Sequence, residues 1–165
     1  MEHRPALSAT WRWRRRGGLY KPCLAEYGGV WREQTGVATS RDLKVWTRYT
    51  GNPIIPNGAA GSLDERFASN PCVVLDGHRW VIFYYSFDKT GKARDLATVG
   101  DDPFHHMKTG QILIGVGPPG SVDSTFAHKL SVIWHEGALY HFYCAVSGKY
   151  PNEIRGISVA RSRPW

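Results

Sequence analysis

Two stretches of the sequence match each other: Gly51–Ala68 (GNPIIPNGAAGSLDERFA) and Gly110–Ala127 (GQILIGVGPPGSVDSTFA). Corresponding positions of the two stretches are 59 residues apart, the alignment needs no gap, and eight of the 18 positions are identical. Similarity at a fixed spacing indicates a structural unit that is repeated along the chain. The sequence therefore predicts repeated units that bury their apolar faces against each other.

A weaker third copy lies near the N-terminus. Residues 18–29 (GLYKPCLAEYGG) resemble residues 138–149 (ALYHFYCAVSGK). A chain of 165 residues holds about 2.8 units of 59. We therefore expect one partial domain over residues 1–165, with units at about 3–66, 67–125 and 126–165.

Short strands are predicted within each unit. In the middle unit the expected strands are Pro71–Leu75, Arg79–Phe87, Asp95–Val99 and Gln111–Ile114. Aromatic and β-branched residues are frequent in them, Gly and Pro fall between them, and no window shows a helical apolar period. Four short strands in a repeat of this length are typical of a β-propeller blade. The predicted fold is all-β, with about three four-stranded antiparallel blades.

Three blades cannot close a ring, because propellers typically contain about four to eight. An open arc exposes sheet faces that invite another chain to bind. A second copy is the simplest partner, since most oligomers are two-fold homodimers. We therefore expect a homodimer that completes the ring; the alternative is that the chain is a fragment of a longer protein.

The composition excludes several classes of protein. With 42% apolar and 21% charged residues, the chain is expected to fold. Its apolar runs fall far short of the roughly 20 residues of a membrane helix, and the N-terminus lacks the apolar core of a signal peptide. Its three Cys have no CxxC spacing, which argues against a disulfide scaffold and a zinc site. We expect no membrane contact, cofactor or metal. The lack of a signal peptide and the odd number of Cys favour the cytoplasm, and the compartment stays open because a truncated chain would show the same features.

The net charge of +7 is concentrated near the N-terminus. In residues 11–16 (WRWRRR), the Arg side chains could bind the phosphates of a nucleic acid while the Trp side chains stack on its bases. The rest of the chain is close to neutral, so we interpret this segment as a solvated edge or turn. Nucleic acid is therefore not an expected partner.

Two kinds of passage stand out in the sequence: Thr35–Trp46 (TGVATSRDLKVW), followed by Gly51–Ile55 (GNPII), and the later stretch Tyr140–Ala145 (YHFYCA). The first resembles a passage of the five-bladed β-propeller glycosidases, which include glycoside hydrolase families 32, 43, 68 and 117. The second resembles the blade core of these enzymes. The resemblance implies a glycoside hydrolase-like protein that acts on a plant or algal glycan or oligosaccharide at the tunnel mouth. The alternative is a carbohydrate-binding propeller without turnover.

The resemblance also implies three carboxylates near the inner strands, and this sequence departs from that pattern. Cys72 and His128 occupy two of the corresponding places, and no acid lies at the third, near His3. The standard triad is therefore not carried over. Either the site is divergent or the protein is inactive.

Asp64 and Asp123 occupy the same position in their units, in the loop that enters the inner strand. Two carboxylates from adjacent blades could flank a glycosidic bond, so we assign both to catalysis, with Glu65 and Arg66 binding substrate beside them. The alternative is structural, because an Asp in Gly-Ser-x-Asp stabilises a turn.

Polar residues also begin the expected inner strands. His3 and His128 hold this place in the outer units, and Asn70 holds it in the middle unit. His128 is a candidate acid or base near neutral pH, whereas His3, Asn70 and Lys129 are candidates for binding the substrate. Each His could instead simply pack at the start of a strand.

Overall fold

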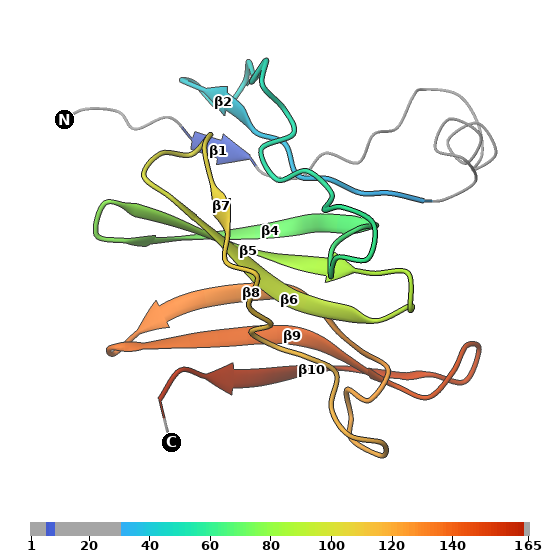
Figure 1. Ribbon diagram of the computed structural model, residues 1–165. Helices are drawn as coiled ribbons and strands as arrows, with labels where there is room; N and C mark the ends of the chain where they lie inside the picture. Colours follow the sequence, from blue (N-terminus) through green and yellow to red (C-terminus); the bar gives the residue numbers. More distant parts are fainter. Residues whose placement is uncertain (1–5, 9–30, 164–165) are drawn as a thin grey trace.

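The computed structural model describes residues 6–8 and 31–163, which form strands without a helix (Figure 1). The strands are β1 (Ala6–Ser8), β2 (Ala38–Ser40), β3 (Thr47–Arg48), β4 (Phe67–Asp76), β5 (Arg79–Phe87), β6 (Ala93–Gly100), β7 (Met107–Lys108), β8 (Phe126–His135), β9 (Ala138–Ser147) and β10 (Ile154–Arg161).

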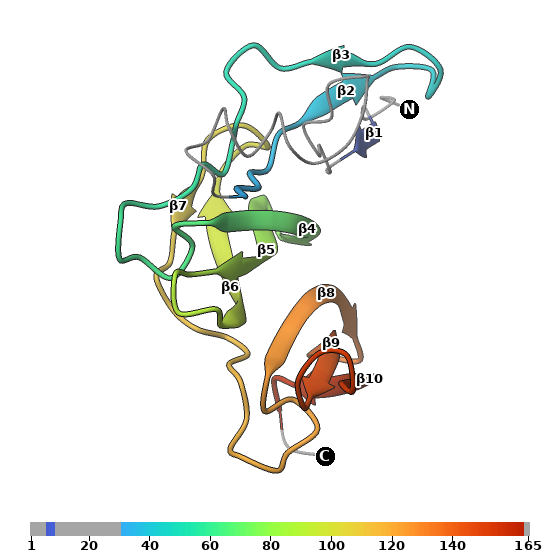
Figure 2. The same ribbon diagram turned by 90° about the vertical axis from the view of Figure 1, so that its right-hand side faces the viewer.

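The strands form three successive units. The first contains β1–β3, the second β4–β7 and the third β8–β10, and neighbouring strands inside each unit are antiparallel. Figure 2 shows the units one after another along an arc. A parallel bridge between Ala93 and Phe126 connects the second unit to the third. The predicted all-β propeller fold is confirmed, and the ring of blades is incomplete.

One predicted strand is in the wrong place. Strand β5 spans Arg79–Phe87 as expected, but the fourth strand of the second unit is Met107–Lys108 and not Gln111–Ile114. Gly110 adopts a φ of +71°, which turns the chain away from the sheet after β7. Ile114 then forms only an isolated bridge to Asp95.

Glycines shape the turn before each inner strand. A Cβ on Gly58 would overlap the Asp64 carboxylate, and one on Gly117 would overlap the Asp123 carboxylate. The hydroxyl of Tyr84 donates to Asp64 over 2.9 Å, and the hydroxyl of Tyr143, 59 residues later, donates to Asp123 over 2.8 Å. The two turns therefore share the same internal bonding.

Both inner strands bulge at the same position. The register of β4 shifts between Ser69 and Cys72, and that of β8 shifts between His128 and Ser131. A bulge re-aims the side chains around it. The pocket described below lies at these two bulges.

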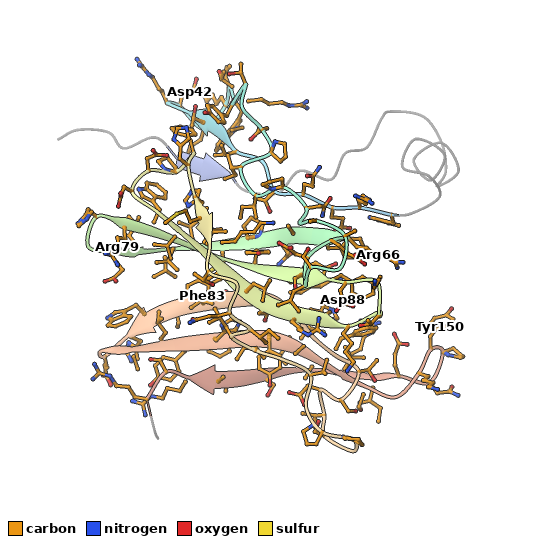
Figure 3. All side chains as sticks on the ribbon, viewed as in Figure 1. Asp42, Arg66, Arg79, Phe83, Asp88 and Tyr150 are labelled. Carbon is orange, nitrogen blue, oxygen red and sulfur yellow. The ribbon has the colours of Figure 1, made fainter. Side chains whose placement is uncertain are left out.

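Apolar cores fill the two seams between the units. Ile82 and Tyr84 of β5 face the first unit, where they meet a cluster that includes Val37 and Ile55. Phe83, on the opposite side of β5, packs with Val132 of the third unit. Figure 3 labels Phe83 between the second and third units. Each seam is therefore one blade face packed against another.

Candidate functional site

A pocket of about 290 Å³ lies between the segment that begins at Trp31 and the start of β4. Figure 1 shows this segment running alongside β4. The pocket lies beside the bulges of the inner strands, where the units meet. Its lining combines aromatic, acidic, amide and basic side chains: Trp31, Glu33, Gln34, Thr35, Phe67, Ser69, Asn70, Pro71, Tyr85 and Lys129.

Glu33 is the one acid among the described lining residues. Its backbone N–H donates to the Arg66 carbonyl, and its own carbonyl accepts from the Ala68 N–H, both over 2.9 Å. The indole N–H of Trp31 donates to Oε1 over 3.1 Å, and the Ser69 hydroxyl donates to Oε2 over 2.7 Å. The carboxylate is therefore held in one orientation, with an acceptor lone pair left on each oxygen.

Asn57 fixes the backbone under this carboxylate. Its amide Nδ2 donates to the carbonyl oxygens of Glu33 over 2.9 Å and of Arg66 over 2.8 Å. Its backbone N–H donates to the side chain of Gln34 over 3.0 Å. Asn57 thus binds the segment that carries Glu33 to the loop that enters β4.

Three aromatic side chains line the pocket: Trp31, Phe67 and Tyr85. Trp31 is 44% exposed, so part of its indole is available to a ligand. Phe67 also lines the pocket, and its ring centroid lies 5.8 Å from that of Tyr85, in an edge-to-face arrangement. An exposed indole beside hydrogen-bonding groups suits a ligand with one apolar face and polar edges.

Asn70 and Lys129 line the pocket from the two bulges. Their φ angles are +54° and +56°, in the left-handed region. Asn tolerates this region well, whereas for Lys it costs roughly 1–2 kcal/mol. Backbone strain of this kind is found preferentially at functional sites.

Of the residues predicted for the site, the pocket brings together Asn70 and Lys129. The described lining does not include the other candidates, Asp64, Glu65, Arg66, Asp123 and His128. His3 lies outside the described residues. The catalytic roles of Asp64, Asp123 and His128 stay predictions.

The structure gives Asp64 strong internal partners. It is 4% exposed, and its Oδ2 accepts from the Tyr84 hydroxyl and lies 2.6 Å from the Lys108 ammonium. Burial, followed by the charge of Asp64, raises the pKa of Tyr84. Asp123 lacks a matching lysine among its described contacts and accepts from Tyr143 and Ser121. The Ser121 hydroxyl is the main cause that lowers the pKa of Asp123.

His128 lies in the seam between the second and third units. It is 6% exposed, and its ring centroid is 5.6 Å from that of Tyr85 and 5.5 Å from that of Phe126. Burial, with the charges of Lys129 and Arg155, lowers its pKa to about 4. The imidazole is therefore neutral at physiological pH.

Glu65 and Arg66 belong to the turn before β4. The Glu65 carboxylate accepts from the Gly61 N–H over 2.5 Å, and the backbone N–H of Arg66 donates to the Phe87 carbonyl over 3.0 Å. Their proposed contact with substrate stays a prediction.

Glu33 was not among the residues predicted from the sequence. Glu33 bridges to Phe67 in the same parallel way that Ala93 bridges to Phe126. Glu33 therefore has the same position in the first unit that Ala93 has in the second. An acid at this position of the repeat was the signal that could have identified Glu33 from the sequence. Ala93 is 60 residues from Glu33, so a search at a spacing of 59 does not align them.

In the described part of the chain, no cluster of three His, Cys, Asp or Glu side chains forms that could hold a metal ion. The described residues likewise include no helix with the length and apolar character needed to cross a membrane.

Comparison with solved structures relates this fold to carbohydrate-active enzymes. A structure described as a glycoside hydrolase matches with 35% identity and a TM-score of 0.66, over 81% of this chain and 36% of that protein. A structure described as a complex of BT0996 and RGII matches with 35% identity and a TM-score of 0.65, over 80% and 36%. The family 117 glycoside hydrolase Zg3597 of the marine bacterium Zobellia galactanivorans matches with 18% identity and a TM-score of 0.68, over 79% and 38%.

These matches confirm the resemblance to β-propeller glycosidases. The chain spans a little over a third of the length of these three structures. No protein-family model and no curated protein matches the sequence.

Proposed function

We propose that this chain is a glycoside hydrolase-like protein that acts on a plant or algal glycan or oligosaccharide in the pocket at the mouth of the propeller tunnel. One observation carries the proposal: a fixed carboxylate, Glu33, lies beside the partly exposed indole of Trp31 in a cavity. The two solved structures at 35% identity, one of them described as a glycoside hydrolase, support it.

Each part of the pocket has a chemical role in this proposal. A sugar ring stacks its apolar face on Trp31, and its hydroxyls bond to Asn70 and Lys129. Glu33 either donates a proton to the glycosidic oxygen as a general acid or accepts a proton from the attacking water as a general base. Hydrolysis requires a second carboxyl group. The described lining has no other acid, so that group must come from elsewhere in the complete ring.

Lys129 indicates which glycans to test first. Its side chain forms no ion pair with the residues that the structure describes, although it lines the same pocket as Glu33. A cation in a pocket favours an anionic group on the ligand. We therefore propose that acidic sugars are preferred over neutral ones of the same size.

A second candidate function is carbohydrate binding without turnover. The internal bonds of Asp64 favour it, because a carboxylate that is bound to Tyr84 and Lys108 is not free to react. Cys72 and His128, in place of acids at the inner strands, favour it as well.

A panel of neutral and acidic oligosaccharides separates the two functions. Binding is measured by calorimetry, and turnover by the release of reducing ends at high protein concentration. Binding with turnover supports the hydrolase, binding alone supports the second candidate, and neither would reject the pocket as a carbohydrate site.

We also propose that two chains associate, so that the pocket is enclosed by a more complete ring. The number of units supports this, because an arc of three blades leaves a sheet face uncovered. The cytoplasmic location stays a prediction.

A further inference from the structure

The turn before β4 and the turn before β8 are built in the same way. The backbone N–H of Gly58 donates to the Asp64 carbonyl over 3.2 Å, and that of Gly117 donates to the Asp123 carbonyl over 3.3 Å. The bond from a tyrosine hydroxyl to each aspartate and the bulge of the following strand recur as well. The features that the blade requires are therefore present at both places.

The polar groups around Glu33, in contrast, do not recur. Ala93 holds the matching position in the next unit, where it makes the same parallel bridge but has no polar side chain. Ser69 donates to Glu33 Oε2 over 2.7 Å, whereas the matching residue of β8 is His128. The acid and the hydroxyl that binds it are thus present together beside β4 and absent together beside β8.

Asn57 follows the same pattern. Its amide donates to the carbonyl oxygens of Glu33 and Arg66. The matching residue 59 positions later is Val116, which has no side-chain donor. A donor that the turn itself required would recur at this position, because the rest of the turn does. The side-chain bonds that surround Glu33 therefore belong to the pocket rather than to the blade.

We propose that Ser69 is a positioning residue for Glu33: its hydroxyl fixes the carboxylate for proton transfer, and the blade does not require it. This inference rests on the function proposed for the pocket. The terminal torsion of a Glu side chain has a broad energy minimum, so hydrogen bonds must select its orientation. Ser69 is 8% exposed, and together with Trp31 it supplies one donor to each carboxylate oxygen.

Ser86 is a matched control for the loss of a buried hydroxyl. It is fully buried on β5, and its hydroxyl donates to the Arg94 carbonyl over 3.1 Å. The described lining of the pocket does not include Ser86. Ser86→Ala therefore removes a structural hydroxyl without touching Glu33, whereas Ser69→Ala removes the hydroxyl that binds it.

Kinetics on an oligosaccharide that the wild type cleaves test the proposal. Ser69→Ala is expected to lower kcat about 10-fold with little change in KM, because a misplaced carboxylate transfers the proton poorly. Ser69→Thr keeps a hydroxyl and should retain most of kcat, and Ser86→Ala should match the wild type. In a Glu33→Gln background, Ser69→Ala should add almost no further loss, because the hydroxyl acts through the carboxylate. If the wild type binds without turnover, affinity measured by calorimetry replaces kcat, with the same order expected.

A second measurement needs no ligand. The carbon-13 resonance of the Glu33 carboxyl, assigned by its loss in Glu33→Gln, is expected to shift in Ser69→Ala and to stay in place in Ser86→Ala. An unmoved resonance, a wild-type kcat for Ser69→Ala or additive losses with Glu33→Gln would overturn the inference. If the wild type neither binds nor cleaves any oligosaccharide, the proposed function fails, and the resonance still decides whether Ser69 fixes Glu33.

Discussion

Asp95 on β6 and His141 on β9 face each other across the seam between the second and third units, with 3.0 Å between Asp95 Oδ2 and His141 Nε2. Asp95 is fully buried and His141 is 7% exposed. Burial raises the pKa of Asp95 to about 6, although His141 acts to lower it. A polar pair thus joins two blades inside an otherwise apolar seam.

Breaking this pair on one side is expected to be costly. His141→Ile leaves the Asp95 carboxylate buried without its partner, which is expected to lower the free energy of unfolding by about 3–5 kcal/mol. The double variant Asp95→Thr/His141→Ile copies the seam between the first and second units, where Thr35 holds the place of Asp95 and Ile82 holds the place of His141. Urea unfolding should show that the double variant is more stable than His141→Ile. A double variant that is less stable than His141→Ile would contradict this account of the seam.

The two turn aspartates provide a matched comparison. Asp64 is buried and paired with Lys108, whereas Asp123 is less buried and bonds only neutral groups in the described structure. Asp64→Asn is expected to cost roughly 3 kcal/mol of stability, and Asp123→Asn roughly 1 kcal/mol. Thermal unfolding of both variants measures the difference. Equal losses would show that the ion pair with Lys108 adds nothing.

His128 makes stability depend on pH. Its pKa is about 4 in the folded protein, below the ordinary value of about 6.5 in the unfolded chain. The unfolded state therefore binds more protons, and stability falls as the pH drops from about 6.5 toward 4, by up to ~1.4 kcal/mol per pH unit. Comparing wild type and His128→Gln by urea unfolding between pH 4 and 8 tests this. The variant should lose that slope, and an unchanged slope would assign it to other groups.

Lys129→Asn separates backbone strain from ligand binding. Asn is the residue at the matching bulge, at position 70, and it tolerates a positive φ better than Lys. Stability is expected to rise by up to ~1 kcal/mol, while affinity for acidic oligosaccharides falls and affinity for neutral ones is kept. Calorimetry with both ligand types checks this, with Lys89→Asn at an exposed position as the control. An equal loss of affinity for acidic and neutral oligosaccharides would contradict the proposed preference for acidic sugars.

The fold could be predicted because its determinants are local. Gly58 and Gly117 are required by the serine and aspartate side chains packed on each of them, and these constraints recur 59 residues apart in the sequence. The fourth strand was placed wrongly because the apolar run at 112–114 resembles a strand. Only the turn at Gly110 and the pairing of β6 with β7 show where the sheet ends.

The pocket was harder to predict because it forms between units. Asn70 and Lys129 were identified from the starts of the inner strands. Glu33 approaches them through its pairing with Phe67 and its bond from Ser69, two residues that belong to the next unit. The ion pair between Asp64 and Lys108 could not be predicted either, because the two residues are 44 positions apart in the sequence and meet only in the folded chain.

The proposed role of Glu33 is the central claim, and its amide variant tests it most directly. On an oligosaccharide that the wild type cleaves, Glu33→Gln is expected to lower kcat at least ~100-fold with little change in KM. Glu136→Gln, at an exposed turn, is the control and should match the wild type. If the wild type binds without turnover, Glu33→Gln should weaken binding measured by calorimetry. A variant with wild-type kcat, or with wild-type affinity where nothing is cleaved, would contradict the account.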